Sequence, residues 1–408
     1  MIFFWSEYGD SLPLARLVAA AGGDVMLYND HDSAEHVGEG LVEVTANPNP
    51  PRGAIVVLDC TGKGDCGSDY RSRGFAVVGG NPYDSLLGKS RRDGIKIMKE
   101  HKIATPEDHY FPTIEKAIEF LEDKDGDWFV KVDGDRGDDS TSNGAPAYLI
   151  RYLHHLGDTD AKVRGVELQK KAEGSEISIE GWFDGQRFVF PFNATVEEKK
   201  FLTGNVGPRT GCESCVVFPY EGPLCEELLK MEDTLRDEGY VGSLDLNMIV
   251  TEKGPLGLEW TARLGFDASD ALFRLLGPTL PEQLEAFAFG ALPTWEFVPA
   301  SALTLRFSVL PYPDTNPKES RKMYGFPLDP AILECDVTDV ALSPDGPVCA
   351  GRDGLLGVVT SVGTDIESMR KEVLDRVSAL KIANLQYRID PVSRWEKTMT
   401  ALEKEGWV

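Results

Sequence analysis

Two lysines in this sequence have the type and spacing to bind a phosphorylated substrate. Lys89 stands at the head of a predicted helix, and Lys131 lies inside the apolar run from Trp128 to Val132. A lysine within an apolar strand is costly unless it meets an anion, so Lys131 is a candidate to contact one. The alternative for Lys131, an exposed position on a half-buried strand, stays open.

The segment after Lys131, from Asp133 to Gly144, is rich in Gly, Asp and Ser. This composition predicts a mobile loop whose backbone N–H groups can close over phosphates. The sequence contains no GxxxxGK[ST] motif, so a Walker-type phosphate loop is excluded.

Four polar residues near position 250 form the most informative group. Asp245 lies on one strand of a predicted hairpin, and Glu259, Thr261 and Arg263 follow on the other. The period of two places the last three on one face, in apolar surroundings that disfavour a solvated strand. Carboxylates on neighbouring strands can hold Mg²⁺ between nucleotide phosphates, and Arg263 can neutralise a transferring phosphoryl group.

The segment from Val166 to Glu176 predicts a nucleoside site. An adenine ring needs an extended backbone that offers one donor and one acceptor, and Glu176 is placed to accept both ribose hydroxyls. The alternative for Glu176, a surface carboxylate on an edge strand, is equally compatible with the sequence.

The elements that position these residues follow from hydrophobic periodicity. Strands and a short helix alternate over the first eighty residues, which predicts a small doubly wound sheet. The remaining predicted elements are helices at 87–102, 114–122, 366–380 and 394–405 and strands at 128–132, 166–169, 175–182, 244–250 and 256–260. Short strands separated by Pro and Gly after Pro299 predict a β-rich C-terminal module.

Length and composition exclude several classes of function. A chain of 408 residues exceeds one core, so several domains are expected. The formal net charge of -25 disfavours polynucleotide binding. No apolar run reaches eighteen residues and the N-terminus does not resemble a signal peptide, so we expect a cytoplasmic protein with no membrane partner. Seven irregularly spaced cysteines suit reduced thiols, with a zinc site at Cys212 and Cys215 as the minor alternative.

The order of these features resembles the ATP-grasp superfamily and, more narrowly, the phosphoribosylamine-glycine ligase family. The resemblance covers nearly the whole chain. It is carried by the phrases Ile103-Ala104-Thr105-Pro106, Phe129-Val130-Lys131-Val132-Asp133-Gly134, Gly207-Pro208-Arg209-Thr210-Gly211, Gly354-Leu355-Leu356-Gly357-Val358-Val359-Thr360 and Tyr387-Arg388-Ile389-Asp390.

The resemblance implies an α/β and α+β multidomain ATP-grasp fold. It divides the chain into a Rossmann-like pre-ATP-grasp domain at 1–85, an ATP-grasp core at 86–295 with a lid at about 106–172, and a β-rich C-terminal domain at 296–408. It implies ATP and Mg²⁺ or Mn²⁺ as cofactors. The implied ATP contacts are Lys89, Lys131, Gln169, Lys171, Ala172 and Glu176; the metal ligands are Asp245, Glu259 and Thr261; the catalytic residues are Arg263, Lys199 and Arg209.

Departures from the family pattern lie mostly at the substrate end. Thr261 replaces a metal-binding Asn, the loop from Tyr8 to Leu12 lacks an Arg and a His, and Cys212 begins an altered segment. We therefore predict a carboxylate-amine ligase that forms an acyl phosphate and joins glycine or another small amino acid to an amine of a sugar phosphate, nucleotide or modified base. The alternatives are the purine-pathway ligase itself and a non-catalytic ATP-binding scaffold. A monomer or homodimer is expected.

Overall fold

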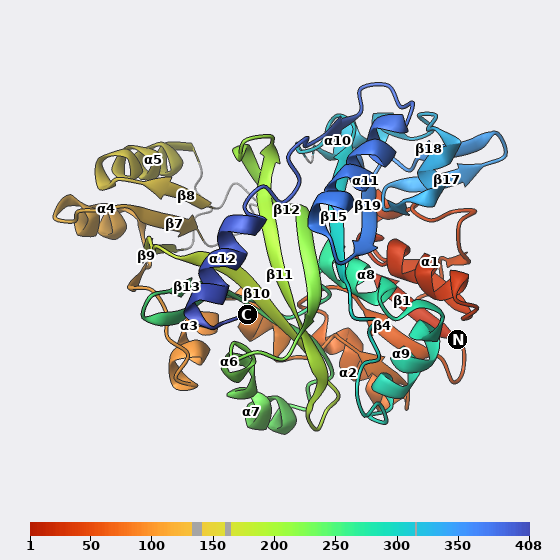
Figure 1. Ribbon diagram of the computed structural model, residues 1–408, viewed down its shortest axis with the longest axis horizontal. Helices are drawn as coiled ribbons and strands as arrows, with labels where there is room; N and C mark the ends of the chain where they lie inside the picture. The colour runs from red at the N-terminus through yellow and green to blue at the C-terminus, as the bar shows by residue number, and fades with distance from the viewer. Residues whose placement is uncertain (133–140, 160–164, 315) are drawn as a thin grey trace.

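The computed structural model describes residues 1–132, 141–159, 165–314 and 316–408 (Figure 1). Within these residues no helix combines the length and apolar character needed to cross a membrane. The predicted phosphate loop falls largely outside the described residues. Its last four residues form strand β8 (Thr141–Gly144), paired with β7, so the loop prediction was wrong there, because cross-strand hydrogen bonding outweighs the loop-like composition.

The first sheet is parallel, with strand order β3-β2-β1-β4-β5. Its strands are short and apolar because helices cover them. This confirms the predicted doubly wound sheet. Its elements are β1 (Ile2–Ser6), α1 (Leu12–Ala20), β2 (Val25–Asn29), β3 (Val44–Thr45), β4 (Ile55–Leu58), α2 (Gly64–Ser72) and β5 (Ala76–Val78).

A smaller four-stranded sheet, order β6-β9-β7-β8, projects to the left in Figure 1. Two helices bury its apolar face and form a core of its own. Its elements are β6 (Asp108–Phe111), α4 (Ile114–Glu122), β7 (Trp128–Val132), β8, α5 (Pro146–Thr159) and β9 (Val166–Lys170).

A nine-stranded sheet forms the centre of the molecule (Figure 1). Its strands are β10 (Ser175–Phe183), β11 (Phe188–Leu202), β12 (Val206–Tyr220), β13 (Gly242–Thr251), β14 (Gly254–Thr261), β15 (Ser301–Ser308), β16 (Asp336–Val337), β19 (Leu355–Gly363) and β20 (Gln386–Tyr387). Strand β15 pairs with β12, so four of the strands after residue 295, β15, β16, β19 and β20, continue the same sheet. The division of the chain at residues 85 and 295 stays a prediction.

Helices and one hairpin surround this sheet. They are α3 (Arg91–Glu100), α6 (Cys225–Leu229), α7 (Glu232–Asp237), α8 (Asp267–Arg274), α9 (Leu280–Ala288), α10 (Pro317–Ser320), α11 (Ile366–Ala379), α12 (Trp395–Glu405), β17 (Val340–Ser343) and β18 (Gly346–Cys349). Helix α3 starts later than predicted, because the Ser90 side chain caps it by accepting from Asp93 N. Lys89 ends the preceding π-helical turn, Ser85–Lys89.

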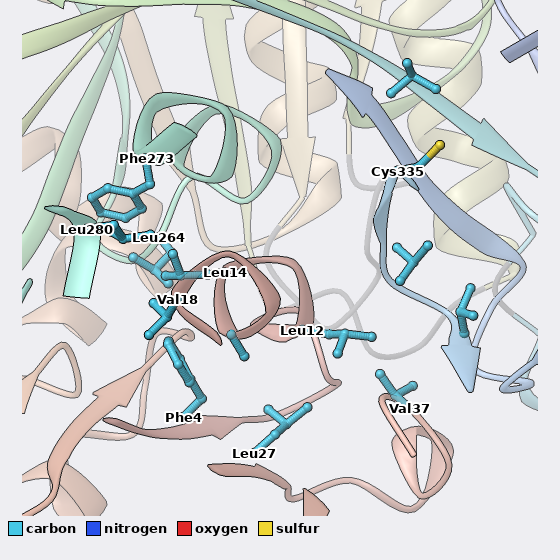
Figure 2. Close-up of a cluster of buried hydrophobic side chains, with 14 of the residues drawn as sticks. Phe4, Leu12, Leu14, Val18, Leu27, Val37, Leu264, Phe273, Leu280 and Cys335 are labelled. Atoms are coloured by element: carbon cyan, nitrogen blue, oxygen red, sulfur yellow. The ribbon is translucent and has the colours of Figure 1, made fainter. Parts of the chain in front are cut away.

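One buried apolar cluster joins the first sheet to the C-terminal part of the chain. Figure 2 shows Leu14 and Val18 of α1 facing Phe273 of α8, while Leu12 and Val37 lie on the side of Cys335. This packing fixes α1 against α8, whose first residues line the second cavity described below.

Phe273 tests the contribution of this cluster to stability. It is fully buried, and its ring centroid lies 5.0 Å from that of Trp182. Phe273→Ala is expected to lower the free energy of unfolding by about 3–5 kcal/mol, measured by denaturant titration of tryptophan fluorescence. Phe289→Ala is the matched control, because Phe289 is 63% exposed. Equal losses in the two variants would contradict this packing.

Candidate functional site

A first cleft opens between the turn before α3, strand β7 of the small sheet and strand β14. Its open volume is about 740 Å³. The lining includes Lys89 and Lys131 together with Glu167 and Glu259. The structure therefore brings both predicted phosphate lysines into one space.

Lys131 is buried, which excludes the alternative of an exposed strand lysine. It pairs across the sheet with Glu167. Burial raises the pKa of Glu167, and the positive charges of Lys131 and Arg91 oppose this rise. Both carboxylate oxygens of Glu167 and Nε2 of Gln169 lack hydrogen-bond partners within the described chain. Buried polar atoms of this kind fit a polar ligand between the two sheets. The sequence reasoning did not assign Glu167 to the site.

The residues predicted around the adenine and ribose lie beside this cleft rather than in its lining. Lys171 donates its backbone N–H to Asp127 O at 2.9 Å, and its ammonium group lies 3.6 Å from the Asp127 carboxylate. Ala172 follows it in the turn before β10. Glu176 is half-buried and lies 3.0 Å from Lys199 Nζ, so it is not a free surface carboxylate.

A second cavity, with an open volume of about 1510 Å³, continues from Glu259 along the central sheet. Lys199 of β11 lines it and contacts Glu176, Glu197 at 3.6 Å and Asn247 Oδ1 at 3.1 Å. Burial would lower the pKa of Lys199, but Glu176, Glu197 and Glu259 outweigh it and raise the pKa well above its usual value. Lys199 therefore stays charged.

Glu259 lines both cavities. Arg91 Nη1 lies 3.3 Å from its carboxylate. Burial would raise the pKa of Glu259, but Lys199, Lys131 and Arg91 outweigh burial and lower the pKa to about 2. Glu259 is thus an ionised carboxylate at the junction of the two spaces.

The hairpin of β13 and β14 places the predicted metal ligands together in the second cavity. Asp245 pairs with Thr261, and Glu259 pairs with Asn247, so the two carboxylates are diagonal neighbours. Asn247 donates to Asp245 Oδ1 at 2.9 Å. The predicted set lacks Asn247, which the β-bulge after this residue puts opposite Glu259.

Arg263 also lines the second cavity. Its guanidinium lies over the Phe266 ring at 4.1 Å and donates to Leu264 O. Burial lowers the pKa of Arg263, and Asp10, Asp59 and Asp245 oppose this. Arg263 is therefore a half-buried guanidinium that can meet a phosphoryl or carboxylate oxygen.

Arg209 lies elsewhere. The segment from Gly207 to Gly211 is part of β12, where Arg209 pairs with Lys200 across a bulged hairpin. The Arg209 guanidinium lies 5.8 Å from the Phe129 ring of β7, outside the lining of the second cavity.

Cys212 and Cys215 are both buried free thiols. Cys215 Sγ lies 3.1 Å from Thr304 Oγ1. Across the described ranges, no group of three or more His, Cys, Asp or Glu is placed to hold a metal ion. This finding does not support the zinc alternative, whereas Mg²⁺ shared with phosphates needs only one or two carboxylates.

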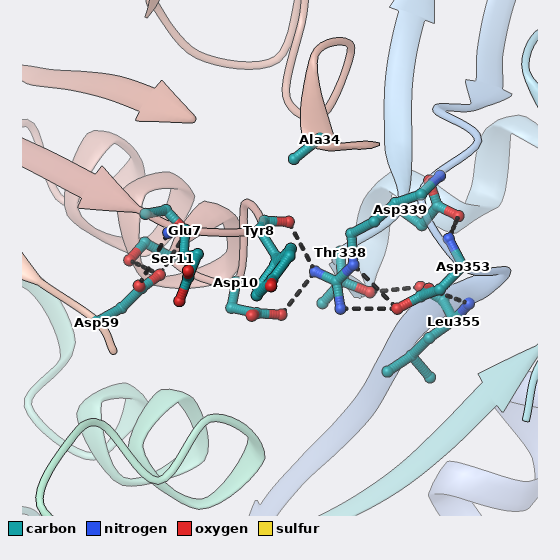
Figure 3. A network of polar contacts seen from close by, with 12 residues as sticks. Glu7, Tyr8, Asp10, Ser11, Ala34, Asp59, Thr338, Asp339, Asp353 and Leu355 are labelled. Carbon is teal, nitrogen blue, oxygen red and sulfur yellow. Dashed lines mark hydrogen bonds and ion pairs between the residues drawn. The ribbon is translucent and has the colours of Figure 1, made fainter. Parts of the chain in front are cut away.

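Arginines from distant segments close the far end of the second cavity. Arg306 donates to both Asp267 oxygens, at 2.6 and 3.0 Å. Arg352 donates to Asp10 at 2.6 Å and to Asp353 at 2.9 Å (Figure 3). Sequence reasoning missed these residues, because nothing local marks contacts between segments 39 positions apart, as for Arg306 and Asp267, or 342 apart, as for Arg352 and Asp10.

Comparisons with known proteins bear on the fold of the chain. No family model matches the chain. A relative named phosphoribosylamine-glycine ligase, from Leifsonia xyli subsp. xyli (strain CTCB07), is 25% identical over 349 residues, which cover 79% of this chain and 80% of the relative. The solved phosphoribosylamine-glycine ligase of Thermotoga maritima superposes with a TM-score of 0.73 at 20% identity, covering 96% of this chain and 100% of that one.

A biotin carboxylase domain from Hydrogenobacter thermophilus, solved with MgADP and bicarbonate, superposes with a TM-score of 0.62 at 12% identity, covering 98% of this chain and 97% of that one. The chain has the ATP-grasp fold. The predicted α/β and α+β ATP-grasp fold and the resemblance to phosphoribosylamine-glycine ligase are confirmed. The roles given to individual residues stay predictions.

The N-terminal sheet is followed by another buried acid, Asp59 (Figure 3). It accepts hydrogen bonds from Ser6 and from Ser11 at 2.8 Å. Burial and the neighbouring Asp10 raise the pKa of Asp59 to about 6, against the opposing effect of these hydroxyl groups.

Asp59 gives a prediction for stability against pH. Above the unfolded pKa near 4 the unfolded chain loses its proton first, so stability falls as pH rises from about 4 to about 6. A shift of about two pKa units corresponds to about 3 kcal/mol. Asp59→Asn is expected to remove this fall, as measured by denaturant titrations at several pH values. An unchanged pH profile would contradict the raised pKa.

Proposed function

We propose that this ligase uses ATP and Mg²⁺ to activate the carboxylate of glycine or another small amino acid and passes the acyl group to an amine of a sugar phosphate, nucleotide or modified base. The observation that carries the proposal is Glu259, an ionised side chain shared by the two cavities. A metal held there has two lysines on one side and Arg263 on the other. Transfer of a phosphoryl group from a nucleotide in the first cleft to a carboxylate in the second cavity needs positive charge on both sides of the metal.

The residues of the first cleft are assigned to the nucleotide. Lys89 and Lys131 would contact the phosphates, Gln169, Lys171 and Ala172 would surround the adenine, and Glu176 would bind the ribose. Nε2 of Gln169 has no hydrogen-bond partner in the described chain, which supports its assignment to the adenine base. Asp245, Glu259 and Thr261 would hold the metal, with Asn247 as a further oxygen ligand.

The second cavity is assigned to the formation of the acyl phosphate and of the amide. The substrate carboxylate attacks the γ-phosphorus, an O–P bond forms, and ADP leaves. Arg263 would stabilise the resulting acyl phosphate, and Lys199 would orient the carboxylate beside it. Arg209, which lies on β12, would be the third catalytic residue beside Arg263 and Lys199. The amine then attacks the acyl carbon, and the C–O bond breaks to give an amide, phosphate and a proton.

The first test is ADP release from ATP and Mg²⁺ across amino acids and amines, with hydroxylamine added separately to trap an acyl phosphate as a hydroxamate. We expect glycine or another small amino acid to give hydroxamate and one amine to give sustained turnover. Phosphoribosylamine as the sole productive amine would identify the purine-pathway ligase. ATP binding without ADP or hydroxamate formation would indicate a non-catalytic scaffold.

The metal assignment is tested by Glu259→Gln. The variant loses a ligand charge, so the Mg²⁺-dependent rate is expected to fall by about a hundredfold or more while the melting temperature changes little. Glu252→Gln, in the exposed turn of the same hairpin, is the matched control and should keep full activity. Retained activity in Glu259→Gln would remove Glu259 from the metal site.

A further inference from the structure

Lys199 lies at an irregular point of the β11–β12 hairpin. Glu198, which precedes it, pairs with Ser214. The next pair is Lys200 with Arg209, so the register shifts across Lys199. A shift of this kind interrupts the regular ladder of hydrogen bonds and bends the strand. The hairpin ladder alone therefore does not fix the place from which the Lys199 side chain enters the second cavity.

The two faces of β11 meet different surroundings at this point. Glu197 and Lys199 both line the second cavity. Because successive side chains of a strand alternate between its faces, Glu198 points away from the cavity. Glu198 is nevertheless only 1% exposed, so other parts of the chain cover this second face of the strand.

The C-terminal segment at 388–394 covers Glu198. The Glu198 carboxylate accepts hydrogen bonds from Ser393 Oγ at 2.8 Å and from the backbone N–H of Arg394 at 3.0 Å. Arg388 Nη1 lies 3.9 Å from the same carboxylate. The segment therefore holds the strand on the N-terminal side of the register shift.

Arg388 also holds the strand on the other side of the shift. Its side chain is fully buried. Nη1 donates to Lys200 O at 2.7 Å and to Asn205 Oδ1 at 2.8 Å. Nε donates to Asp390 Oδ1 at 3.1 Å. One guanidinium thus joins the residue after Lys199 and the turn of the hairpin to the C-terminal segment.

Stability alone does not account for this buried arginine. Taking a guanidinium out of water costs desolvation energy, which its partners only partly return. Nη2 of Arg388 makes no hydrogen bond to a described residue, although it lies 3.0 Å from Asp390 Oδ1. The planar guanidinium does, however, fix the directions of the groups that it contacts. These directions favour a role in geometry.

We propose that Arg388 is a positioning residue for Lys199. Together with Glu198 it holds β11 on both sides of the register shift, and so sets the direction in which the Lys199 ammonium group meets Glu176 and the substrate carboxylate. The inference rests on the proposed function for the role of Lys199 in orienting that carboxylate. The position of Lys199 itself can be measured without turnover.

Chemical labelling measures that position directly. The Lys199 side chain is 18% exposed and forms two ion pairs, so acetic anhydride should acetylate it slowly. In Arg388→Gln we expect its acetylation rate, measured by mass spectrometry, to rise about threefold or more relative to that of exposed Lys371, because weaker pairing with carboxylates lowers the lysine pKa. Buried Lys131 should keep its rate.

Two labelling results would overturn the proposal. One is an unchanged rate at Lys199. The other is an equal rise at Lys199 and Lys131, which indicates general loosening of the fold rather than a local change.

Kinetics of hydroxamate formation test the consequence for the substrate. Arg388→Gln is expected to raise the KM for the amino acid about tenfold and to change the KM for ATP little, because the nucleotide is assigned to the first cleft. Arg388→Lys keeps the charge and should recover part of the loss. A lower kcat with both KM values unchanged, or equal rises in both, would contradict a positioning role. Absence of hydroxamate with the unmodified protein counts against the proposed function, whereas the labelling result stands independently.

Arg394→Gln is the matched control. Arg394 Nε lies 3.6 Å from the same Glu198 carboxylate, but its side chain is 51% exposed, and an exposed ion pair contributes little. We expect Lys199 acetylation and both KM values as in the unmodified protein. Effects as large as those of Arg388→Gln would show that charge beside Glu198, rather than the buried guanidinium, is responsible.

A milder variant keeps the test decisive if Arg388→Gln does not fold. Asn205→Gly removes one acceptor of Arg388, and glycine tolerates the φ of 56° at this position. We expect the same change in Lys199 acetylation with a smaller size. Unchanged Lys199 acetylation in both Asn205→Gly and Arg388→Lys would overturn the proposal.

Discussion

The ionised state of Glu259 is the electrostatic constraint on which the site depends. Its side chain is 45% exposed, and cations from three separate elements lower its pKa to about 2. Arg91 comes from α3, Lys131 from the small sheet and Lys199 from β11. These three elements therefore meet around the Glu259 carboxylate of β14, where the two cavities also meet.

A similar balance operates throughout the second cavity. Its carboxylates outnumber its cations, and paired arginines at the far end tie the N-terminal loop and the C-terminal strands to the central sheet. Those pairs connect segments that lie far apart in the chain, so they contribute to assembly as well as to local charge. Burial of ion pairs costs desolvation energy, which the bidentate geometry at Arg306 offsets in part.

Sequence patterns predicted the elements that depend on residues close together in the chain. The alternation of strands and helices in the first eighty residues predicted the doubly wound sheet, and the hairpin of β13 and β14 followed from two apolar runs around a Gly turn. The β11–β12 hairpin was not predicted, because its Gly and Pro residues suggest a loop while its pairing with β15 is set by residues almost ninety positions away. The partners of Lys199 and Arg352 were equally inaccessible, since only tertiary packing brings them together.

The pairing of Asn247 with Glu259 bears on the departure at Thr261. A threonine hydroxyl is a weaker metal ligand than an amide oxygen, which made the metal site doubtful from sequence alone. The strand register puts the Asn247 amide two residue pairs away, 2.9 Å from Asp245, on the adjacent strand. Its carbonyl oxygen accepts a hydrogen bond from Lys199 at 3.1 Å, a contact that a metal ion at this oxygen would replace. The oxygen missing at position 261 therefore has a neighbour able to supply it from β13.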